Sequence, residues 1–523
     1  MTVYTLLALS FGLLLSLAVS RVVYALYFSP YKDIPGPKLC KITRYWAVYH
    51  DMWLRRARKI REWHSTYGDV VLVAPGEVSV SSASLTKEIY GSTGRHPKSH
   101  YFDNFMFYGE RPIFCALGVK EHRQLLKRTF AFYQPTSIYQ SATLEPICRN
   151  ARKLVDLLKT EIKIRPTVDV LLFCNYYSFD NITNLTYGPR LCARTIEDNE
   201  CEERVILQGW KEVEVWNNLS YNFPLVHKII RGVLSWAKRD PAFLSAEERL
   251  IEWNMEKVIS ARTSPDKMVP GSLLHQLTHA KTPDGEPLSI SWIAAEILDN
   301  LHAAQTTVAL ALTFALWNLA RQPQWQDRVR QELRSLPRSA DGFPEFAAIM
   351  NAPVLDACVR ESSRVNPLSS GRAERVVPAT KAYGAFVLPA GTLVSSSTLS
   401  LHHRPDVFQD AQSYRPDRWL NADEETLRVM ESCLVAFGYG ARLCLGKAFA
   451  LAEIKLLVAA VVMEFEFCND PLSSTTGRNM EQLGTQNAMP RGQRCDLSFR
   501  LSGVETSMAV GSGETRLDTT DPL

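Results

Sequence analysis

The sequence predicts a mainly helical α+β protein with small β-sheets, preceded by one transmembrane helix at its amino terminus. Three features predict this fold class: an uncharged apolar run over 2–20, a long stretch without Pro or Gly over 288–322, and short β-like runs near both ends of the body. The 523 residues would suggest about three domains of ~150 residues each. The chain has no internal repeat and no low-complexity linker, so we expect one large mixed body instead.

Composition and charge exclude several classes of protein. Hydrophobic residues make up 46% of the chain and charged residues 22%, which excludes a disordered, collagen-like or coiled-coil protein for the bulk. The formal net charge of +4 is too balanced for nucleic-acid wrapping, so we expect no nucleic-acid partner. The 11 cysteines are odd in number and form no Cys-x-x-Cys pair, which argues against a disulfide scaffold or a zinc ribbon. A mostly reduced, cytosol-facing protein is expected.

The amino terminus predicts a permanent membrane anchor. Residues 2–20 are uncharged, and a helix of that length would span ~29 Å, close to the ~30 Å hydrocarbon core of a bilayer. Arg21 ends the run, and the bases that follow it place the rest of the chain in the cytosol by the positive-inside rule. The competing interpretation is a cleaved signal peptide, because 18–20 resembles a small-residue cleavage site. The length of the run and the absence of Lys or Arg before it favour the anchor.

The segment that follows the anchor must turn. In 33–38 two prolines flank a glycine, and such a sequence cannot continue a helix. It is either an ordinary linker or a stiff hinge that orients the body on the bilayer. The expected organisation is an anchor over 1–29, one body over 30–502, and a tail over 503–523 that is poor in large apolar residues and should fray.

The body reads as mainly helical, with β-like runs at 70–73, 78–80, 386–388 and 392–395. Its longest helical signal covers 288–322 and is apolar on most faces, so this helix should be buried. The middle of this helix reads His302-Ala-Ala-Gln-Thr-Thr307, where small and polar residues interrupt the apolar surface. These residues either leave room for a ligand to approach the backbone or form an ordinary polar step inside a core helix.

The strongest chemical signal surrounds Cys444, in the sequence Phe437-Gly-Tyr-Gly-Ala-Arg-Leu-Cys-Leu-Gly446. Cys444 precedes a run over 447–462 that reads as a buried helix, and free N–H groups at a helix amino terminus stabilise a thiolate. The glycines of this loop would let the backbone pass close to a flat partner, and Arg442 suits a carboxylate. A single thiolate with no other soft ligand nearby points to haem iron and away from zinc.

The segment 437–446 resembles the haem-binding signature Phe-x-x-Gly-x-Arg-x-Cys-x-Gly of the cytochromes P-450, and the resemblance extends over roughly 30–500. It implies that Cys444 is the metal ligand and that Phe437, Gly440 and Arg442 help to bind the cofactor. Glu361-Ser-Ser-Arg364 resembles the Glu-x-x-Arg helix of the family. Arg418, in a Pro-x-Arg segment, would complete a buried Glu–Arg–Arg cluster.

The resemblance implies two further parts of the site. In each of them this sequence departs at one position from the family pattern. Arg375 matches an arginine that binds a haem propionate, and Lys127 is the candidate for a second propionate-binding base, although the aromatic residue usual before that base is missing. Thr306 matches the threonine of the oxygen-activation pattern, and Gln305 replaces its acid. These two residues are the catalytic candidates, but an amide cannot give up a proton near neutral pH, which puts the usual proton relay in doubt.

The resemblance implies the cytochrome P-450 fold over 30–502 and a haem b cofactor with an axial thiolate. It implies a monooxygenase that takes electrons from NADPH through a separate flavoprotein reductase and inserts one atom of O₂ into an apolar small molecule. The expected location is the endoplasmic reticulum membrane, single-pass, with the catalytic domain in the cytosol. The segments 33–38 and 485–486 are similar to those of fungal enzymes of secondary metabolism.

Two other classes stay open at this point. A haem-thiolate isomerase or dehydratase needs neither O₂ nor a reductase; Gln305 favours this class and Thr306 argues against it. A non-catalytic haem sensor would not need the aromatic segment 101–114, which is either a pocket wall or ordinary core. Oxygen consumption that depends on NADPH and reductase separates the three classes. The substrate cannot be read from the sequence.

Overall fold

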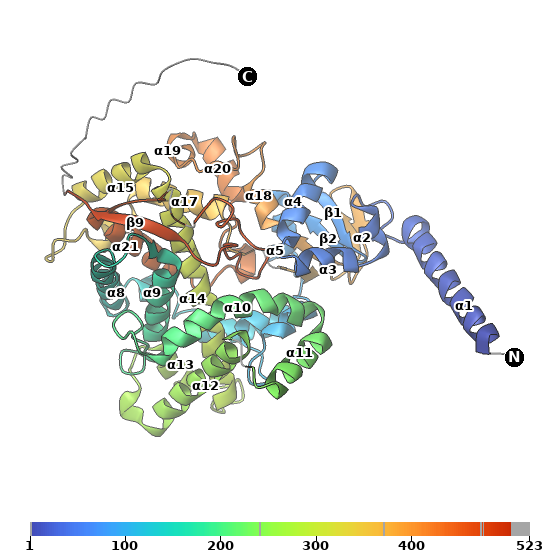
Figure 1. The fold of residues 1–523 in the computed structure, drawn as a ribbon, viewed down its shortest axis with the longest axis horizontal. Coiled ribbons are helices and arrows are strands. Elements are labelled where there is room, and N and C mark those ends of the chain that lie inside the picture. The colour runs from blue at the N-terminus through green and yellow to red at the C-terminus, as the bar shows by residue number, and fades with distance from the viewer. Residues whose placement is uncertain (1–2, 240–241, 370–371, 471–472, 474, 504–523) are drawn as a thin grey trace, which may run out of the picture.

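The computed structural model describes residues 3–239, 242–369, 372–470, 473 and 475–503, and it confirms the predicted fold class. Helices dominate, and the described residues form three small sheets (Figure 1). The predicted fraying of the tail concerns 504–523, which lie outside the described residues.

The helices follow one another through the whole body, with strands between them near both ends. The first half contains α1 (Val3–Val23), α2 (Lys38–Ile42), α3 (Tyr45–Met52), α4 (Arg56–Tyr67), α5 (Ala83–Tyr90), α6 (Val119–Thr129), α7 (Pro135–Ile138), α8 (Ser141–Glu161), α9 (Val170–Tyr187), α10 (Glu202–Asn222), α11 (Pro224–Trp236) and α12 (Ala242–Thr263). The second half contains α13 (Leu273–His279), α14 (Ile290–Ala320), α15 (Pro323–Ser335), α16 (Phe346–Met350), α17 (Pro353–Val365), α18 (Thr398–His402), α19 (Asp417–Asn421), α20 (Glu424–Cys433) and α21 (Lys447–Glu464).

The largest sheet has the strand order β1-β2-β7-β4 and joins the two ends of the body. In it, β1 (Val70–Ala74) pairs antiparallel with β2 (Glu77–Val80), β2 is parallel to β7 (Leu393–Ser396), and β7 is antiparallel to β4 (Arg375–Val376). The other sheets are β3-β9-β8, from Val168–Asp169, Asp496–Leu501 and Phe465–Cys468, and the hairpin of β5 (Lys381–Tyr383) with β6 (Phe386–Leu388). All four predicted runs form strands, namely β1, β2, β6 and β7.

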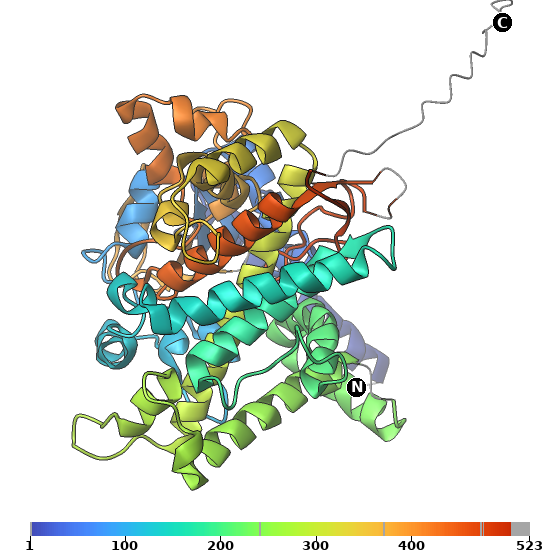
Figure 2. The ribbon, with the colours of Figure 1, turned by 90° about the vertical axis from the view of Figure 1, so that its left-hand side faces the viewer.

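The predicted long helix is α14, and it lies at the centre of the body (Figure 1). It begins after Ser289, whose Oγ accepts a hydrogen bond from the backbone N–H of Trp292 (3.1 Å). Most of its residues are buried because it packs against α9 and α21. Figure 2 shows α8 and α21 running side by side across the same body. The apolar length of α14 therefore serves the protein core.

The amino-terminal helix α1 stands apart from the body (Figure 1), and none of its residues is buried. Among the described residues, Val3–Phe28 and Ile290–Ala320 are the two helical stretches that are long and apolar enough to cross a membrane. Only the first of them exposes its apolar side chains, as a membrane anchor must do.

The turn after the anchor packs against the body. The backbone N–H of Leu72 in β1 donates to the carbonyl of Pro35 (2.8 Å). A Cβ at Gly36 would lie 2.7 Å from the carbonyl oxygen of Leu72, so only glycine permits this close approach. The turn is thus held against β1, as a hinge of fixed direction would be.

Candidate active site

The thiol of Cys444 projects from a tight loop just before α21. The backbone N–H of Cys444 donates to the carbonyl of Phe437 (2.8 Å), which closes the loop, and the side chain is exposed. Desolvation by the loop raises the pKa of the Cys444 thiol, while the backbone N–H of Gly446 and the charge of Lys447 lower it. The loop therefore offers one sulfur that a ligand can reach from outside.

Gly440 shapes this loop by allowing a close contact inside the protein. Its φ is +72°, and a Cβ there would lie 2.1 Å from the carbonyl oxygen of Tyr90, at the end of α5. The need for glycine at this position thus comes from packing against α5. The same packing holds the Cys444 loop against the body.

Four basic side chains from distant segments gather beside the loop: Lys98, His122, Arg375 and Arg442, hereafter the basic cluster. Burial and the positive charges of the other three residues lower the pKa of His122 to about 4. The pKa of Lys98 is lowered by burial and by the charges of Arg375 and Arg442. Burial, followed by the charge of Arg375, lowers the pKa of Arg442 to about 10. Because their positive charges repel one another, bringing these groups together costs free energy in the absence of an anion.

Backbone carbonyls and aromatic rings position the basic cluster. Arg442 donates to the carbonyls of Ala116 (2.6 Å), Leu117 (3.1 Å) and Gly118 (3.1 Å). Lys98 lies 4.0 Å from the ring centroids of both Phe102 and Phe114. Arg375 lies over the rings of Tyr90 (5.0 Å) and Phe102 (5.7 Å). Among the described residues no carboxylate forms an ion pair with Lys98, Arg375 or Arg442, so their charge is available to an anionic ligand.

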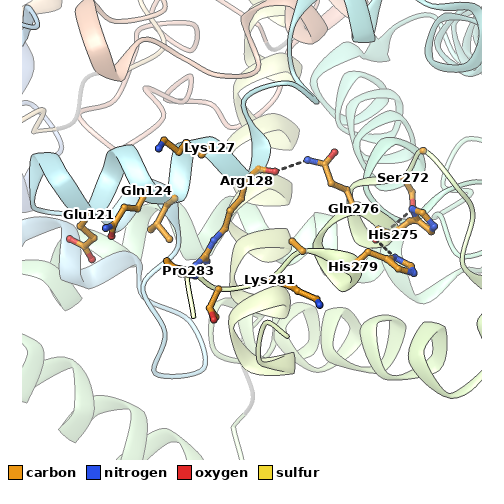
Figure 3. Close-up of a pocket in the computed structure, with 14 residues that line it drawn as sticks. Glu121, Gln124, Lys127, Arg128, Ser272, His275, Gln276, His279, Lys281 and Pro283 are labelled. Carbon is orange, nitrogen blue, oxygen red and sulfur yellow. Dashed lines mark hydrogen bonds between the residues drawn. The ribbon is translucent and has the colours of Figure 1, made fainter. Parts of the chain in front are cut away.

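Lys127 does not join this cluster. It is exposed at a surface recess of about 790 Å³ between α6 and α13 (Figure 3). It lies five positions after His122 on the same helix, which turns the two side chains about 140° apart. His122 therefore takes the place in the basic cluster that the sequence assigned to Lys127.

The open face of α14 consists of small residues and one hydroxyl. Ala303 is exposed, and Ala304 and Thr307 are half-buried. Thr307 Oγ1 donates a hydrogen bond to the carbonyl of Ala303 (2.6 Å). The spacing of three and four residues puts these side chains on one side of the helix. This spacing is the signal that would have indicated Thr307 in the sequence.

Gln305 and Thr306 point away from that face. Thr306 Oγ1 donates to Gln305 Oε1 (2.8 Å), and Gln305 Nε2 donates to Oδ1 of Asn175 in α9. Ser178 Oγ, also in α9, donates to the carbonyl of Gln305 (2.9 Å). Thr306 borders a crevice of about 10 Å³ that Asn175 also lines. The pair therefore fastens α9 to α14, and the structure does not bring it to the open face.

Tyr133 connects the open face of α14 with the Cys444 loop. Its hydroxyl donates to Oδ1 of Asn300 in α14 (2.5 Å). Burial raises the pKa of Tyr133, and the charges of Glu296, Asp299 and Cys444 raise it further. Tyr133 thus hydrogen-bonds to α14 and feels the charge of Cys444 from the other side.

The predicted Glu–Arg–Arg cluster forms between α17 and α19. Arg364 donates to both carboxylate oxygens of Glu361 (2.7 and 2.9 Å), and Arg418 Nε donates to Glu361 Oε1 (3.0 Å). Trp419 Nε1 donates to Glu361 Oε2 (2.9 Å). The side chains of Glu361 and Arg364 are completely buried, so each charge depends on the other.

The residues of this site fit a haem. The thiol of Cys444 is accessible, which suits an iron that takes one protein sulfur. The basic cluster lacks ion-pair partners in the part of the chain that the structure describes, and the two carboxylates of a haem would supply its missing anions. The small side chains of Ala303 and Ala304 leave room next to α14 for a flat group and for a ligand beside that group.

Comparisons with known proteins agree with this geometry. The model of the family described as cytochrome P-450 matches residues 35–490. The chain is 38% identical to cytochrome P-450 monooxygenase FGM1 of Gibberella zeae, over 93% of this chain and 96% of that protein. It is 24% identical to the fusicoccadiene 8-ol C-16 hydroxylase of Alternaria brassicicola, over 88% of this chain and 92% of the relative. It is 28% identical to cytochrome P-450 monooxygenase aflU of Aspergillus parasiticus, over 89% and 92% of the two chains.

The family match covers most of the body, and it includes the Cys444 loop, α14 and the Glu–Arg–Arg cluster. Membership implies a haem whose iron is bound by a thiolate, and it implies an oxidoreductase that incorporates molecular oxygen. The resemblance predicted from the sequence motifs is thereby confirmed, and the chain belongs to the cytochrome P-450 family.

Proposed function

We propose that this protein is a membrane-anchored haem-thiolate monooxygenase that inserts one atom of O₂ into a mainly apolar small molecule. The observation that carries the proposal is the combination of the accessible thiol of Cys444 with the open, small-residue face of α14 that presents Thr307. The named activities of the relatives, monooxygenase and hydroxylase, support the same reaction type. None of these printed names supports the isomerase or sensor alternatives.

Different residues of the site would bind different parts of the cofactor. Cys444 would bind the iron, and the basic cluster would bind the two carboxylates. Phe437 and Gly440 would hold the loop in position through the hydrogen bond to Cys444 and the contact with α5. The bound haem supplies the activation of oxygen, to which thiolate donation contributes.

On α14, Thr307 would hold the proton and pass it on to the ligand. Its hydroxyl hydrogen is held by the Ala303 carbonyl (2.6 Å) on the open face, where it can be redirected to a ligand and replenished by water or by a substrate hydroxyl. Thr306 cannot do this in the observed geometry, because its hydroxyl is committed to Gln305. In this proposal Gln305 positions α9, so its replacement of an acid does not by itself interrupt proton delivery.

The remaining parts of the proposal concern partners and location. Electrons would come from NADPH through a separate flavoprotein reductase, as is usual in this family. The exposed helix α1 would anchor the chain in the endoplasmic reticulum membrane with the catalytic domain, 30–502, in the cytosol. Relatives from fungi support a role in fungal secondary metabolism.

The deciding experiment measures oxygen consumption by the full-length, haem-loaded protein with reductase and NADPH. Candidate substrates would be screened for a product that contains one atom from ¹⁸O₂. A monooxygenase requires O₂, NADPH and the reductase, and it gives a product that carries one labelled oxygen atom. Conversion of a substrate without O₂ or reductase would instead support the isomerase class.

A further inference from the structure

Several segments meet around His302 of α14 and leave buried polar atoms there without partners. His302, which precedes Ala303, packs edge-on against the rings of Phe107 (5.0 Å between centroids) and Trp210 of α10 (4.5 Å). Trp210 and Glu214 are four residues apart and therefore share one face of α10. This face of α10 is thus turned toward the side of α14 that carries His302, which neighbours the open face at Ala303.

Glu214 lies where α10 meets the chain segment near residue 487. Its side chain is only 4% exposed, and its Oε1 accepts a hydrogen bond from Asn487 Nδ2 (2.6 Å). The neighbouring Gln486 accepts a hydrogen bond from the hydroxyl of Tyr101 (3.0 Å). Tyr101 in turn packs against Tyr221 of α10 (5.6 Å between centroids). The carboxyl group thus lies near the place where α10 meets the two chain segments that hold residues 101 and 487.

Three polar atoms of this region have no hydrogen-bond partner among the described residues: Glu214 Oε2, Trp210 Nε1 and His302 Nε2. Trp210 is only 6% exposed and Glu214 4%. A buried polar group without a partner is rare, because it loses its hydration without compensation. Burial and the neighbouring Glu247 raise the pKa of Glu214 to about 7, although Asn487 lowers it, so the carboxyl group is held in surroundings that disfavour its charge.

We infer that the substrate already carries at least one hydroxyl group, which donates a hydrogen bond to Glu214 Oε2. Trp210 Nε1 and His302 Nε2 offer further partners for oxygen atoms of the same molecule. The inference rests on the proposed function, and it refines the substrate class from an apolar molecule to an oxygenated one. A reaction that leaves a free hydroxyl group, such as hydroxylation, carbonyl reduction or hydrolysis, must therefore precede this step.

The alternative is that Glu214 has only a structural role and holds the segment around Asn487. Glu214→Gln distinguishes the structural role from the substrate-binding role, because the amide oxygen of the new side chain can still accept a hydrogen bond from Asn487 Nδ2. Its amide nitrogen then replaces the free acceptor with a donor. Glu212→Gln is the matched control, since Glu212 is exposed on the same helix.

The test uses the full-length, haem-loaded ferric protein and two pairs of probes: 1-dodecanol with its methyl ether, and 2-naphthol with its methyl ether. Each ether keeps the oxygen acceptor and lacks the donor. The shift of the Soret band on titration gives the dissociation constants. We expect the wild type and Glu212→Gln to bind the alcohol of at least one pair about tenfold more tightly than its ether. Glu214→Gln should lose this preference and keep the wild-type melting temperature.

Three results would overturn the inference: equal binding of alcohol and ether by the wild type, a preference that persists in Glu214→Gln, or no Soret shift with any of the four probes. A lowered melting temperature of Glu214→Gln with unchanged preference would assign Glu214 the structural role. Failure of the proposed function is distinguishable, because it would show as missing NADPH-dependent oxygen consumption whatever the binding preference.

Discussion

Thr307 Oγ1 donates a hydrogen bond to the carbonyl oxygen of Ala303, 2.6 Å away and one turn earlier in α14. The two residues lie on the open face of the helix, whereas Thr306, the next residue toward the amino terminus, is buried against α9. One position along a helix turns a side chain by about 100°, and here that turn separates a residue of the site from a residue of the core.

We expect Thr307→Ala to divert electrons from product to hydrogen peroxide, because it removes the hydroxyl that would hold the proton at the open face. General acid–base assistance is typically worth 10²–10⁴-fold, so product per NADPH should fall on the order of tenfold or more. The measurement is product and peroxide per NADPH with an accepted substrate. Thr306→Ala is the control and should stay near the wild type; if it alone uncouples the reaction, Thr306 delivers the protons.

Cys444→Ser should abolish the red-shifted Soret band of the ferrous carbonyl complex, because neither an alkoxide nor a neutral hydroxyl replaces thiolate donation. The spectrum should be recorded on the full-length protein. Cys468→Ser is a matched control, since Cys468 is the other cysteine that is exposed in the described chain. An unchanged carbonyl spectrum in Cys444→Ser would show that another residue binds the iron.

Glu361→Gln should destabilise the fold strongly, because it leaves the buried guanidinium of Arg364 without its counter-charge. Breaking a buried pair in this way costs about 3–5 kcal/mol. The exposed pair of Asp410 with Arg415 (3.0 Å) provides the control, and Asp410→Asn should cost less than about 1 kcal/mol. Chemical denaturation of both variants tests this difference, and equal midpoints would show that the buried cluster is not needed for stability.

Removal of residues 1–29 should shift much of the protein from the membrane fraction to the soluble fraction while haem binding is retained. The reason is that α1 is exposed along its length and contributes no buried residue. Part of the protein should stay bound, because α11 exposes Leu225 (70%), Ile229 (58%) and Trp236 (86%). Fractionation and the carbonyl spectrum are measured together; loss of haem on truncation would mean that the segment belongs to the fold.

Glu296 predicts a specific pH dependence of stability. Burial raises the pKa of Glu296 from its ordinary value of 4.5 to about 7, against the backbone N–H of Ile113 and the side chain of Asn300. Between these two values the folded state binds more protons than the unfolded state, so the free energy of unfolding falls as the pH rises through this range. Over the whole range, the titration of Glu296 lowers the free energy of unfolding by about 3 kcal/mol.

Glu296→Gln should remove this part of the slope, since an amide does not titrate. Denaturation at pH values between 4.5 and 7 measures it, with Glu286→Gln, at an exposed position, as the control. Identical slopes for Glu296→Gln and the wild type would show that Glu296 titrates normally in the folded protein.

The sequence by itself determined those features that depend on neighbouring residues. The uncharged run of α1, the start of α21 after Cys444 and the pairing of Glu361 with Arg364 all follow from local spacing. A membrane anchor needs only an unbroken apolar stretch, and a helix amino terminus needs only a loop followed by a helical run. The place of Arg418 beside the buried carboxylate of Glu361, 57 positions away, could be foreseen only through the resemblance of its Pro-x-Arg segment to the family.

Tertiary structure alone decided which side chains face the site. Helical spacing shows that Thr306 and Thr307, or His122 and Lys127, point in different directions, but it does not show which direction leads to the thiol. That choice depends on the packing of α9 against α14 through Gln305 and Asn175, and of α6 beside the Cys444 loop through Arg442. Such contacts join residues more than 100 positions apart, so their physical cause is the arrangement of whole helices and not the sequence around either residue.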